Sequence, residues 1–400
     1  MQISLLTIRY PPARGGGESL AESLADILVR SGHEVIVETT NLASTYPWRK
    51  LAGPSSGISN PEVGGNLKIH RHRAVRMLYP PVPGILFHLF TNKPSLVIAI
   101  NIPQFHTESA ALYSKLTRRP FVVIPIGAHL HHPPDVSVSK GRIRQFLSNM
   151  YMRTLARMTM STATLVLCLT QDEVDFYEKW MPALKARLCL LPTPLETGRF
   201  KRASPPQPDK PFVVCYLGRF ARGKGLESLV DAVGILHDEG RNVRLTLVGS
   251  DFGLETSIRE MCRARRLDSI IQVRKDVTEA EKVEILSESH CIALPSYYES
   301  FGISIMEGFA AGLPAIATER GGMKFLVQDG FNGAIVRYDD ASSLADAIRK
   351  LSEKDRWHRT SLNALHSVMK YDSTEVSKYL VGLINGTVSK REPDRRNSAI

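Results

Sequence analysis

Two glutamates in the second half of the chain have the surroundings expected of side chains that bind hydroxyl groups. Glu299 and Glu307, with seven residues between them, lie in the stretch PSYYESFGISIMEGFAAGLP (residues 295–314). The apolar residues before this stretch predict a buried strand, and Ser300 and Gly302 predict the start of a helix. Glu299 would follow the strand, and Glu307 would lie about one turn inside the helix. Either acid alone is more often an ordinary surface residue, so the prediction depends on what accompanies the pair.

A second stretch, LGRFARGKGLESLVDAV (residues 217–233), adds the cations Arg219 and Lys224 at another predicted helix start. Positive charge there opposes the helix dipole unless an anion binds, and such a conflict is typical of a functional site. Two cations can neutralise a leaving diphosphate without a metal ion. Neither a Walker P-loop nor a GxGxxG fingerprint is present. Glycines that permit close backbone approach to a ligand are Gly218, Gly223 and Gly225.

The composition is that of a globular protein with an anionic partner. The five cysteines lack CxxC spacing, which disfavours a disulfide framework or a thiolate zinc site and favours the reducing cytoplasm. Residues 1–200 hold 22 Lys and Arg against 13 Asp and Glu, whereas the remainder holds 29 against 27. A basic first half suggests an anionic membrane surface, a phosphorylated acceptor or nucleic acid, although an ordinary solvated surface is the alternative.

The elements that must position these residues alternate between strand and helix. A proline-rich stretch at 201–211 interrupts the alternation and predicts an interdomain linker. The pattern predicts an α/β protein of two doubly wound Rossmann-like domains, whose parallel sheets face a central cleft and bind ligands at the carboxyl ends of their strands. Strands are expected at 3–9, 34–40, 66–70, 96–100, 121–126, 164–169 and 187–191, and then at 212–218, 243–249, 270–273, 291–295, 314–318 and 333–336.

Five stretches of the second half resemble, in their order and spacing, the C-terminal half of a retaining glycosyltransferase of family 4, a member of glycosyl transferases group 1. These stretches are GRFARGKG, LVGS, PSYYESFGISIMEGFAAGLPAIAT, RGG and DGFNGAIV. The match covers residues 212 to about 350 and is looser in the N-terminal half. The resemblance implies the GT-B fold. We expect an N-terminal acceptor-binding domain at 1–203, a C-terminal nucleotide-sugar-binding domain at 211–370, a helix at 371–386 that packs on the first domain, and a disordered tail at 387–400.

The resemblance also assigns roles position by position. Arg219 and Lys224 match the residues that hold the donor diphosphate, and Glu299 matches the acid beside the transferred sugar. Glu307 matches the acid that binds the nucleotide ribose. Further donor-binding positions are Gly218 in the first loop, the turn formed by Phe301, Gly302 and Ile303, and Gly16 and Gly17 in an N-terminal glycine loop.

The sequence departs from the family pattern at three places. After the strand near residue 121 it has PIGAHLHHP, where His129 is the expected active-site histidine and His131 the alternative. The three histidines there could instead bind a metal, but no carboxylate or thiolate partner accompanies them. Phe325 replaces the acid of the family's GG-x-x-E, and Glu196 takes the place of an aspartate before the linker.

The implied reaction moves a sugar from a UDP- or GDP-sugar to a hydroxyl with retained configuration and without a metal or other cofactor. We expect a lipid-linked or cell-envelope glycan as the acceptor. Residues 70–90 and 140–160 combine cations with apolar side chains, so they could rest on an anionic membrane surface, although an ordinary core-facing helix is equally consistent. The expected location is therefore the cytoplasm, with peripheral attachment to the inner face of the cell membrane.

Other classes of protein fit less well. An inactive nucleotide-sugar-binding protein would not need all four charged residues, and a GT-B epimerase would convert the donor without an acceptor. A phosphorylase would need a pyridoxal lysine, for which no motif is present. Nucleic-acid binding is favoured only by charge, because interleaved aromatic platforms are missing.

Overall fold

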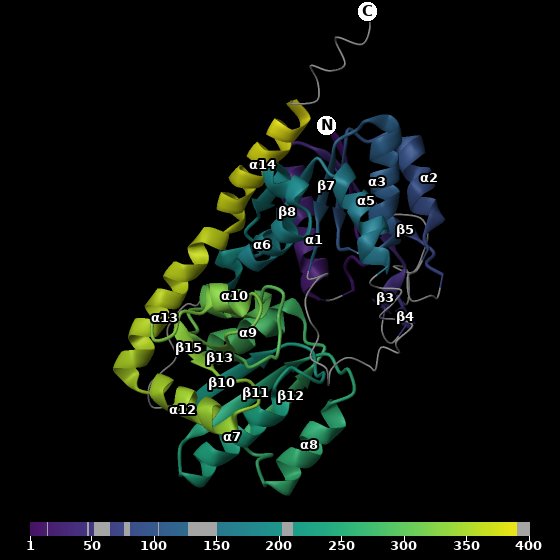
Figure 1. The fold of residues 1–400 in the computed structure, drawn as a ribbon. Coiled ribbons are helices and arrows are strands. Elements are labelled where there is room, and N and C mark those ends of the chain that lie inside the picture. Colours follow the sequence, from purple (N-terminus) through teal and green to yellow (C-terminus); the bar gives the residue numbers. More distant parts are fainter. Residues whose placement is uncertain are drawn as a thin grey trace, which may run out of the picture. The chain divides into compact units, whose positions relative to one another are not determined.

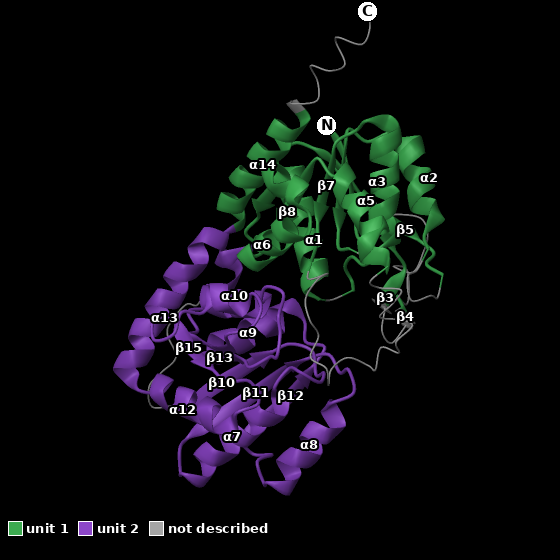
Figure 2. Cartoon of the chain, in the orientation of Figure 1, with its two compact units in different colours: residues 1–131, 139–194, 373–400 green, residues 132–138, 195–372 purple. Residues whose placement is uncertain are grey.

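The computed structural model divides the chain into two compact units, coloured separately in Figure 2. The structure describes residues 1–13, 15–45, 48–51, 65–75, 81–102, 104–126, 150–201 and 211–389. Unit 1 comprises the described residues of 1–131, 139–194 and 373–400, and unit 2 those of 132–138 and 195–372. The chain thus passes from unit 1 to unit 2 at 194–195 and returns to unit 1 at residue 373, and residues 202–210 of the expected linker lie outside the described residues.

Unit 1 is built on a parallel sheet whose described strands occur where the apolar runs predict them. Its central strands are buried on both faces, as parallel strands between helical layers must be. Across the sheet the order is β5 (Leu67–His72), β2 (Glu34–Thr40), β1 (Gln2–Leu6), β6 (Leu96–Ile100), β7 (Phe121–Ile124), β8 (Leu165–Cys168) and β9 (Leu188–Leu190).

Helices cover this sheet (Figure 1). In α1 (Gly16–Arg30), leucines four residues apart at 20, 24 and 28 are buried, as the helical period requires. The C-terminal helix α14 (Ser373–Ser389) packs against α1, and α2, α3 and α5 lie side by side. The other helices of the unit are α2 (Pro83–Asn92), α3 (Phe105–Thr117), α5 (Leu155–Thr162), α6 (Gln171–Trp180) and the 3-10 helix η2 (Pro182–Arg187).

Two features of unit 1 differ from the expectation. A short antiparallel pair, β3 (Leu42–Thr45) and β4 (Trp48–Lys50), follows β2. Within the stretch 70–90, for which a membrane surface and an ordinary core-facing packing were equally consistent, Arg71 and His72 are buried. Arg71 donates a hydrogen bond to the carbonyl oxygen of Pro11. These two side chains face the fold because β5 pairs with β2.

Unit 2 has a second parallel sheet, and its strands also match the predicted ranges. In chain order the strands proceed from β10 to β11 and β12 on one side and then from β13 to β15 on the other. This reversal beside β10 places the ends of β10 and β13 next to each other. Across the sheet the order is β12 (Ile271–Lys275), β11 (Val243–Gly249), β10 (Phe212–Leu217), β13 (Cys291–Leu294), β14 (Ala315–Thr318) and β15 (Gly333–Val336).

The helices of unit 2 begin at local signals that the sequence carries. Thr278 and Glu281 form a reciprocal capping box that starts α9, and Asp340 caps α12. The set is η3 (Thr197–Phe200), α7 (Leu226–Asp238), α8 (Glu255–Ala264), α9 (Glu279–Glu288), α10 (Ile303–Ala310), α11 (Met323–Leu326), α12 (Ala341–Leu351), α13 (Lys354–Val368) and η4 (Met369–Tyr371). Within the described residues, no helix has the length and apolar character needed to cross a bilayer.

Candidate functional site

The loops that follow β10 and β13 are held together by their backbones. The N–H of Tyr297 donates to the carbonyl oxygen of Gly223 over 2.7 Å. Gly225, the N-cap of α7, has a left-handed backbone with φ of 69°, and a Cβ there would collide with the carbonyl oxygen of Pro295. Glycine is required at this position for both reasons. The two stretches that the sequence singled out are therefore neighbours at one edge of the sheet.

Lys224 and Glu299 form an ion pair across these loops. The Lys224 Nζ lies 2.7 Å from Oε1 of Glu299, and both side chains are mostly buried. The hydroxyl of Ser296 donates to the same oxygen over 2.9 Å, while the Ser296 carbonyl accepts from the Thr318 hydroxyl. Both bonds to Glu299 end on one oxygen. Among the described residues, the other oxygen is left to accept a hydrogen bond from a ligand.

Arg219 occupies the same loop but points elsewhere. Its guanidinium lies over the ring of Phe252, with the carbon atom 5.2 Å from the ring centroid, and the side chain is exposed. Beneath it, the Tyr216 hydroxyl donates to the Arg219 carbonyl oxygen. Burial raises the pKa of Tyr216, the Glu299 charge raises it further and Arg219 lowers it. Both charges therefore act on one buried phenol, although they are not paired with each other.

The start of α10 is open to a ligand. Gly302 is its N-cap, with φ of 95°, and no side chain caps the helix. Phe301 is buried, with its ring edge-on to Tyr371, so only its backbone can serve a ligand. Gly322 donates its N–H to the Glu299 carbonyl oxygen over 2.8 Å. A Cβ on Gly321 would collide with that same oxygen. The RGG motif thus packs directly under the predicted turn.

Glu307 has a different cation partner. Its Oε1 lies 2.6 Å from Nζ of Lys282 on α9, and Lys282 also contacts the half-exposed Glu279 at 2.8 Å. Burial raises the pKa of Glu307 despite the opposing effect of Lys282. Burial would lower the pKa of Lys282, but the two carboxylates outweigh it and raise that pKa. Both side chains of the pair are largely buried, so a ligand hydroxyl would meet the Glu307 carboxyl in a site with little competing water.

Arg320 and two tyrosines form an aromatic cluster beside the first acid. The guanidinium carbon of Arg320 is 4.3 Å from the Tyr297 ring centroid and 5.7 Å from that of Tyr338. The two rings meet edge to face with centroids 5.1 Å apart. The sequence prediction did not include this cluster. The adjacent tyrosines before Glu299 were the available signal.

Other predicted positions are not brought to this site within unit 2. Gly16 and Gly17 begin α1 in unit 1, at the carboxyl end of β1. His129 and its alternative His131 lie outside the described residues. Phe325 is on α11 with its ring partly exposed, and no acid takes its place in the motif.

Sequence reasoning also missed Lys282 and Ser296, which hold the two acids. Lys282 lies 25 residues before Glu307, and its helix carries an unremarkable mixture of charges, so no local pattern marks it. In the described part of the chain, the one cluster of three or more potential metal ligands belongs to unit 1. The metal-free donor site stays a prediction.

Comparison with known proteins supports the resemblance most strongly for unit 2. Residues 198–365 match the family glycosyl transferases group 1. D-inositol 3-phosphate glycosyltransferase of Corynebacterium aurimucosum is 31% identical over 148 residues, which are 36% of this chain and 35% of that protein. The enzyme of the same name from Paenarthrobacter aurescens is 25% identical over 368 residues and 84% of each chain. Several of the curated relatives are thus matched over less than half of their length.

Solved structures match nearly the whole chain at low identity. Sucrose-phosphate synthase from Thermosynechococcus elongatus has a TM-score of 0.75 at 20% identity, covering 97% of this chain and 99% of that one. Anabaena HepE in complex with UDP has a TM-score of 0.74 at 17% identity, covering 96% and 100%. These matches confirm the predicted fold class. Residues 198–365 therefore match the family glycosyl transferases group 1, and the chain as a whole has the GT-B fold.

Proposed function

We propose that the protein is a retaining glycosyltransferase that moves a sugar from a nucleotide-diphosphate sugar to a hydroxyl acceptor. The observation that carries the proposal is the ion pair between Lys224 and Glu299, which joins the ends of β10 and β13 beside two uncapped helix starts. The cation and the helix dipoles suit a diphosphate. Glu299 suits the hydroxyls of the transferred sugar, and Glu307 those of the nucleotide ribose.

In the proposed reaction the bond between the anomeric carbon and the donor phosphate breaks as the acceptor oxygen attacks the same face of the sugar. The departing phosphate oxygen takes the acceptor proton. Lys224 and Arg219 stabilise the charge that develops on the diphosphate, so that the protein supplies position and charge rather than a base. This scheme requires neither a metal nor another cofactor, and it leaves a histidine such as His129 to contact the sugar.

A UDP-sugar is the first donor to test. Similar folds have been solved with UDP and glucose in Anabaena HepE and with UDP and GlcNAc in the pneumococcal O-GlcNAc transferase GtfA. The family resemblance makes Gly16 and Gly17, at the start of α1, further proposed donor-binding positions. GDP-sugars are the alternative donors, and the experiment below decides which nucleotide base and which sugar the donor carries.

We further propose that unit 1 receives a lipid-linked or cell-envelope acceptor at an anionic membrane surface. The neighbouring helices α2, α3 and α5 expose large apolar side chains at helical spacing, accompanied by exposed cations such as Lys115 and Arg157. Apolar contact together with basic charge favours peripheral binding to anionic lipid. The exposed apolar side chains are Phe87, Phe90, Leu112, Leu116, Leu155 and Met158.

A thermal-shift panel of UDP, GDP and ADP, each free and with its common sugars, tests the donor proposal. A ligand that binds the native state raises the melting temperature. We expect one nucleotide series to stabilise the wild type and Lys224→Ala to lose most of that shift. Arg222→Ala, a change at an exposed cation of the same loop, should keep it. Equal shifts in all three proteins would remove Lys224 from the donor site.

Two assays separate the alternatives. An inactive binding protein would show the thermal shift but no donor turnover with any acceptor tried, including water. A GT-B epimerase would convert the sugar nucleotide without an acceptor.

Flotation with anionic and with neutral liposomes tests the membrane proposal. Equal recovery from both kinds of liposome would remove the electrostatic part of that proposal.

A further inference from the structure

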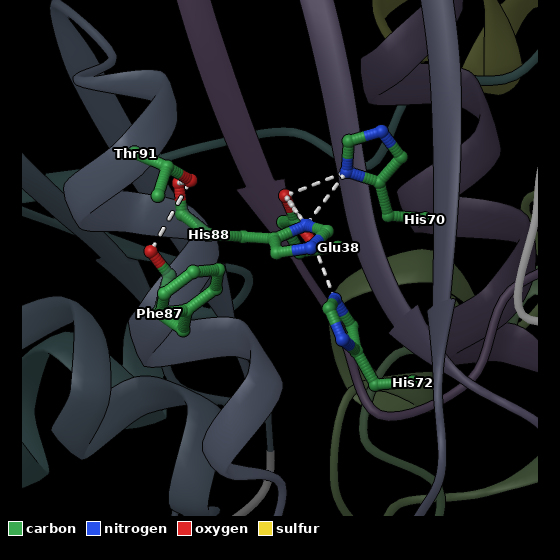
Figure 3. Close-up of polar contacts among 6 residues, drawn as sticks. All are labelled: Glu38, His70, His72, Phe87, His88 and Thr91. Atoms are coloured by element: carbon green, nitrogen blue, oxygen red, sulfur yellow. Dashed lines mark hydrogen bonds and ion pairs between the residues drawn. The ribbon is translucent and has the colours of Figure 1, made fainter.

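Unit 1 contains a buried carboxylate surrounded by three imidazoles, which the proposed transfer reaction does not use (Figure 3). Glu38 on β2 is fully buried. His70 and His72 come from the adjacent strand β5, and His88 comes from α2. Sequence reasoning treated the two strand histidines as surface charge and did not connect them with Glu38.

The sheet register makes this cluster rigid. Glu38 is paired with His70 across the parallel strands β2 and β5, and Thr40 is paired with His72. Side chains two residues apart on a strand share a face, so both imidazoles point to the face that carries Glu38. From α2, His88 lies between them, with its ring centroid 4.8 Å from that of each histidine. In the first turn of α2, a Cβ on Gly84 would come within 2.6 Å of the His72 ring.

The distances in the cluster match those between the ligands of a metal ion. The Nδ1 atoms of His70 and His88 are 3.0 Å apart, and they lie 3.1 Å and 3.5 Å from Oε1 of Glu38. Zn²⁺ ligands at 2.0–2.2 Å in a tetrahedron are separated by about 3.3 Å. These three atoms therefore form a triangle of the size that one face of a zinc site requires.

His72 approaches Glu38 from the side opposite His70, and the group of residues whose ligand atoms gather most closely is Glu38, His72 and His88, without His70. The Nε2 of His72 lies 2.5 Å from the other oxygen of Glu38, and the ligand atoms of Glu38, His72 and His88 all lie within 4.8 Å of one another. Imidazole nitrogens combined with a carboxylate suit Zn²⁺ and related divalent transition metals, whereas Mg²⁺ and Ca²⁺ prefer oxygen ligands.

The electrostatics of the cluster also favour a cation. Glu38 is fully buried, so a divalent ion bound beside its carboxylate would offset a charge held away from solvent. The His88 side chain is 34% exposed, which leaves solvent a path to the ligand atoms.

We propose that Glu38, His70, His72 and His88 form a structural binding site for a divalent transition metal of the zinc type in unit 1. The ion ties the edge strand β5 and the helix α2 to β2. Ligands drawn from β2, β5 and α2 join separate elements of the fold, as is typical of structural zinc. The site does not depend on the proposed transferase activity, because its ligands all belong to unit 1 and its readout is metal binding.

Metal content of the tag-free chain tests the proposal. The protein is stripped with EDTA, incubated with Zn²⁺ and passed through a desalting column, and its metal is counted by elemental mass spectrometry. We expect about one zinc ion per chain in the wild type. His88→Ala and Glu38→Gln should weaken binding by at least about 100-fold, the upper end of the loss seen when only an outer-sphere partner of a metal is removed.

Matched controls keep the outcome unambiguous. His366→Gln removes an exposed histidine on α13 and should retain the full metal content. Mg²⁺ in place of Zn²⁺ should not bind, whereas Co²⁺ should give the visible absorption of a tetrahedral site in the wild type and not in His88→Ala. Circular dichroism verifies folding. If Glu38→Gln does not fold, the change at the partly exposed His88 decides the test.

Two results would overturn the proposal. One is a wild-type chain that retains less than about a tenth of a zinc ion after the column. The other is equal zinc content in the wild type and a folded His88→Ala chain. Either would show that the imidazoles serve only to hydrogen-bond the buried carboxylate.

Discussion

The acids of unit 2 and the acid of unit 1 have different partners, and the partners decide what each site can bind. Glu299 and Glu307 each face a lysine at 2.7 and 2.6 Å. Glu38 faces imidazole nitrogens at comparable distances. An ammonium group has donors only, whereas a neutral imidazole also has a lone pair. The acids paired with lysine can accept hydrogen bonds from ligand hydroxyls, but their lysine partners have no lone pair for a metal ion. The imidazoles of the unit 1 cluster do have such a lone pair.

The two regions also differ in how they are built. The unit 2 site depends on loops after strands, held by glycines such as Gly225 where no Cβ fits. The unit 1 cluster depends on register between two strands and on one helix. Loops allow a ligand to approach the backbone, whereas strand side chains fix a geometry. This contrast suggests that changes in unit 2 should affect turnover and changes in unit 1 should affect stability and metal content.

The largest effect should come from the cations of unit 2. Arg219→Ala and Lys224→Ala should each lower kcat by about 100- to 1000-fold, the usual loss when one stabiliser of developing charge is removed. For Arg219→Ala, KM should change much less, since that interaction strengthens in the transition state, whereas Lys224→Ala should also raise KM because it removes ground-state binding of the nucleotide. Steady-state kinetics with the donor found by thermal shift measure both constants, and Arg222→Ala is the control. A raised KM with unchanged kcat would assign these residues to ground-state binding alone.

A smaller effect is expected at the second acid. Glu307→Gln should weaken donor affinity by about 10- to 100-fold, because a hydrogen bond to a charged acceptor contributes about 1.5–3 kcal/mol. Isothermal titration with the nucleotide alone measures it. Glu279→Gln removes the half-exposed partner of the same lysine, where a surface ion pair contributes about 1 kcal/mol or less. Equal losses in the two variants would show that Lys282, rather than Glu307, governs binding.

A fall in pH should destabilise unit 1 through His106. This residue is buried, and burial lowers its pKa from 6.5 to about 4. The unfolded chain binds this proton more readily, so the stability contributed by the neutral ring is complete above pH 6.5 and is lost as the pH falls toward 4. The loss at about pH 5 should be about 2 kcal/mol. Urea unfolding of wild type and His106→Asn at about pH 7.5 and pH 5 measures it. An identical pH response in both proteins would rule out this role.

The smallest effect should follow the loss of the Arg320 cation over Tyr297. Arg320→Ala should lower the free energy of unfolding by about 0.5–1 kcal/mol, the value of an exposed cation–π contact. Arg337→Ala, at an arginine whose side chain is 88% exposed next to Tyr338, is the control and should change stability by less. A larger loss at Arg337 would show that the aromatic cluster is held by another contact.

Much of the fold could be predicted from the sequence because its signals are local. Apolar runs of four to seven residues marked the strands of both sheets, and among the described strands only β3 and β4, which are short, were missed. The predicted linker and active-site histidine lie outside the described residues.

The candidate site was predictable to the extent that its residues belong to contiguous motifs. Lys224 and Glu299 were expected near one strand edge, and their ion pair agrees with that. Lys282, Ser296 and the stacking of Arg320 were not foreseen, because each depends on which helix or turn packs beside the acid. The direction of the Arg219 side chain, over Phe252 rather than toward Glu299, also depends on the neighbouring strand.

The sequence by itself determined the alternation of strands and helices, the two glycine-led helix starts and the acids that follow β13, since periodicity, backbone freedom and chain order are properties of neighbouring residues. Only the tertiary structure decided the partners of those acids. Glu38 and His88 are 50 residues apart in the chain and share a cluster because β2, β5 and α2 meet. Hydrogen bonds and dehydration depend on distances of a few ångströms, and such distances between remote residues exist only after the sheets and helices have packed.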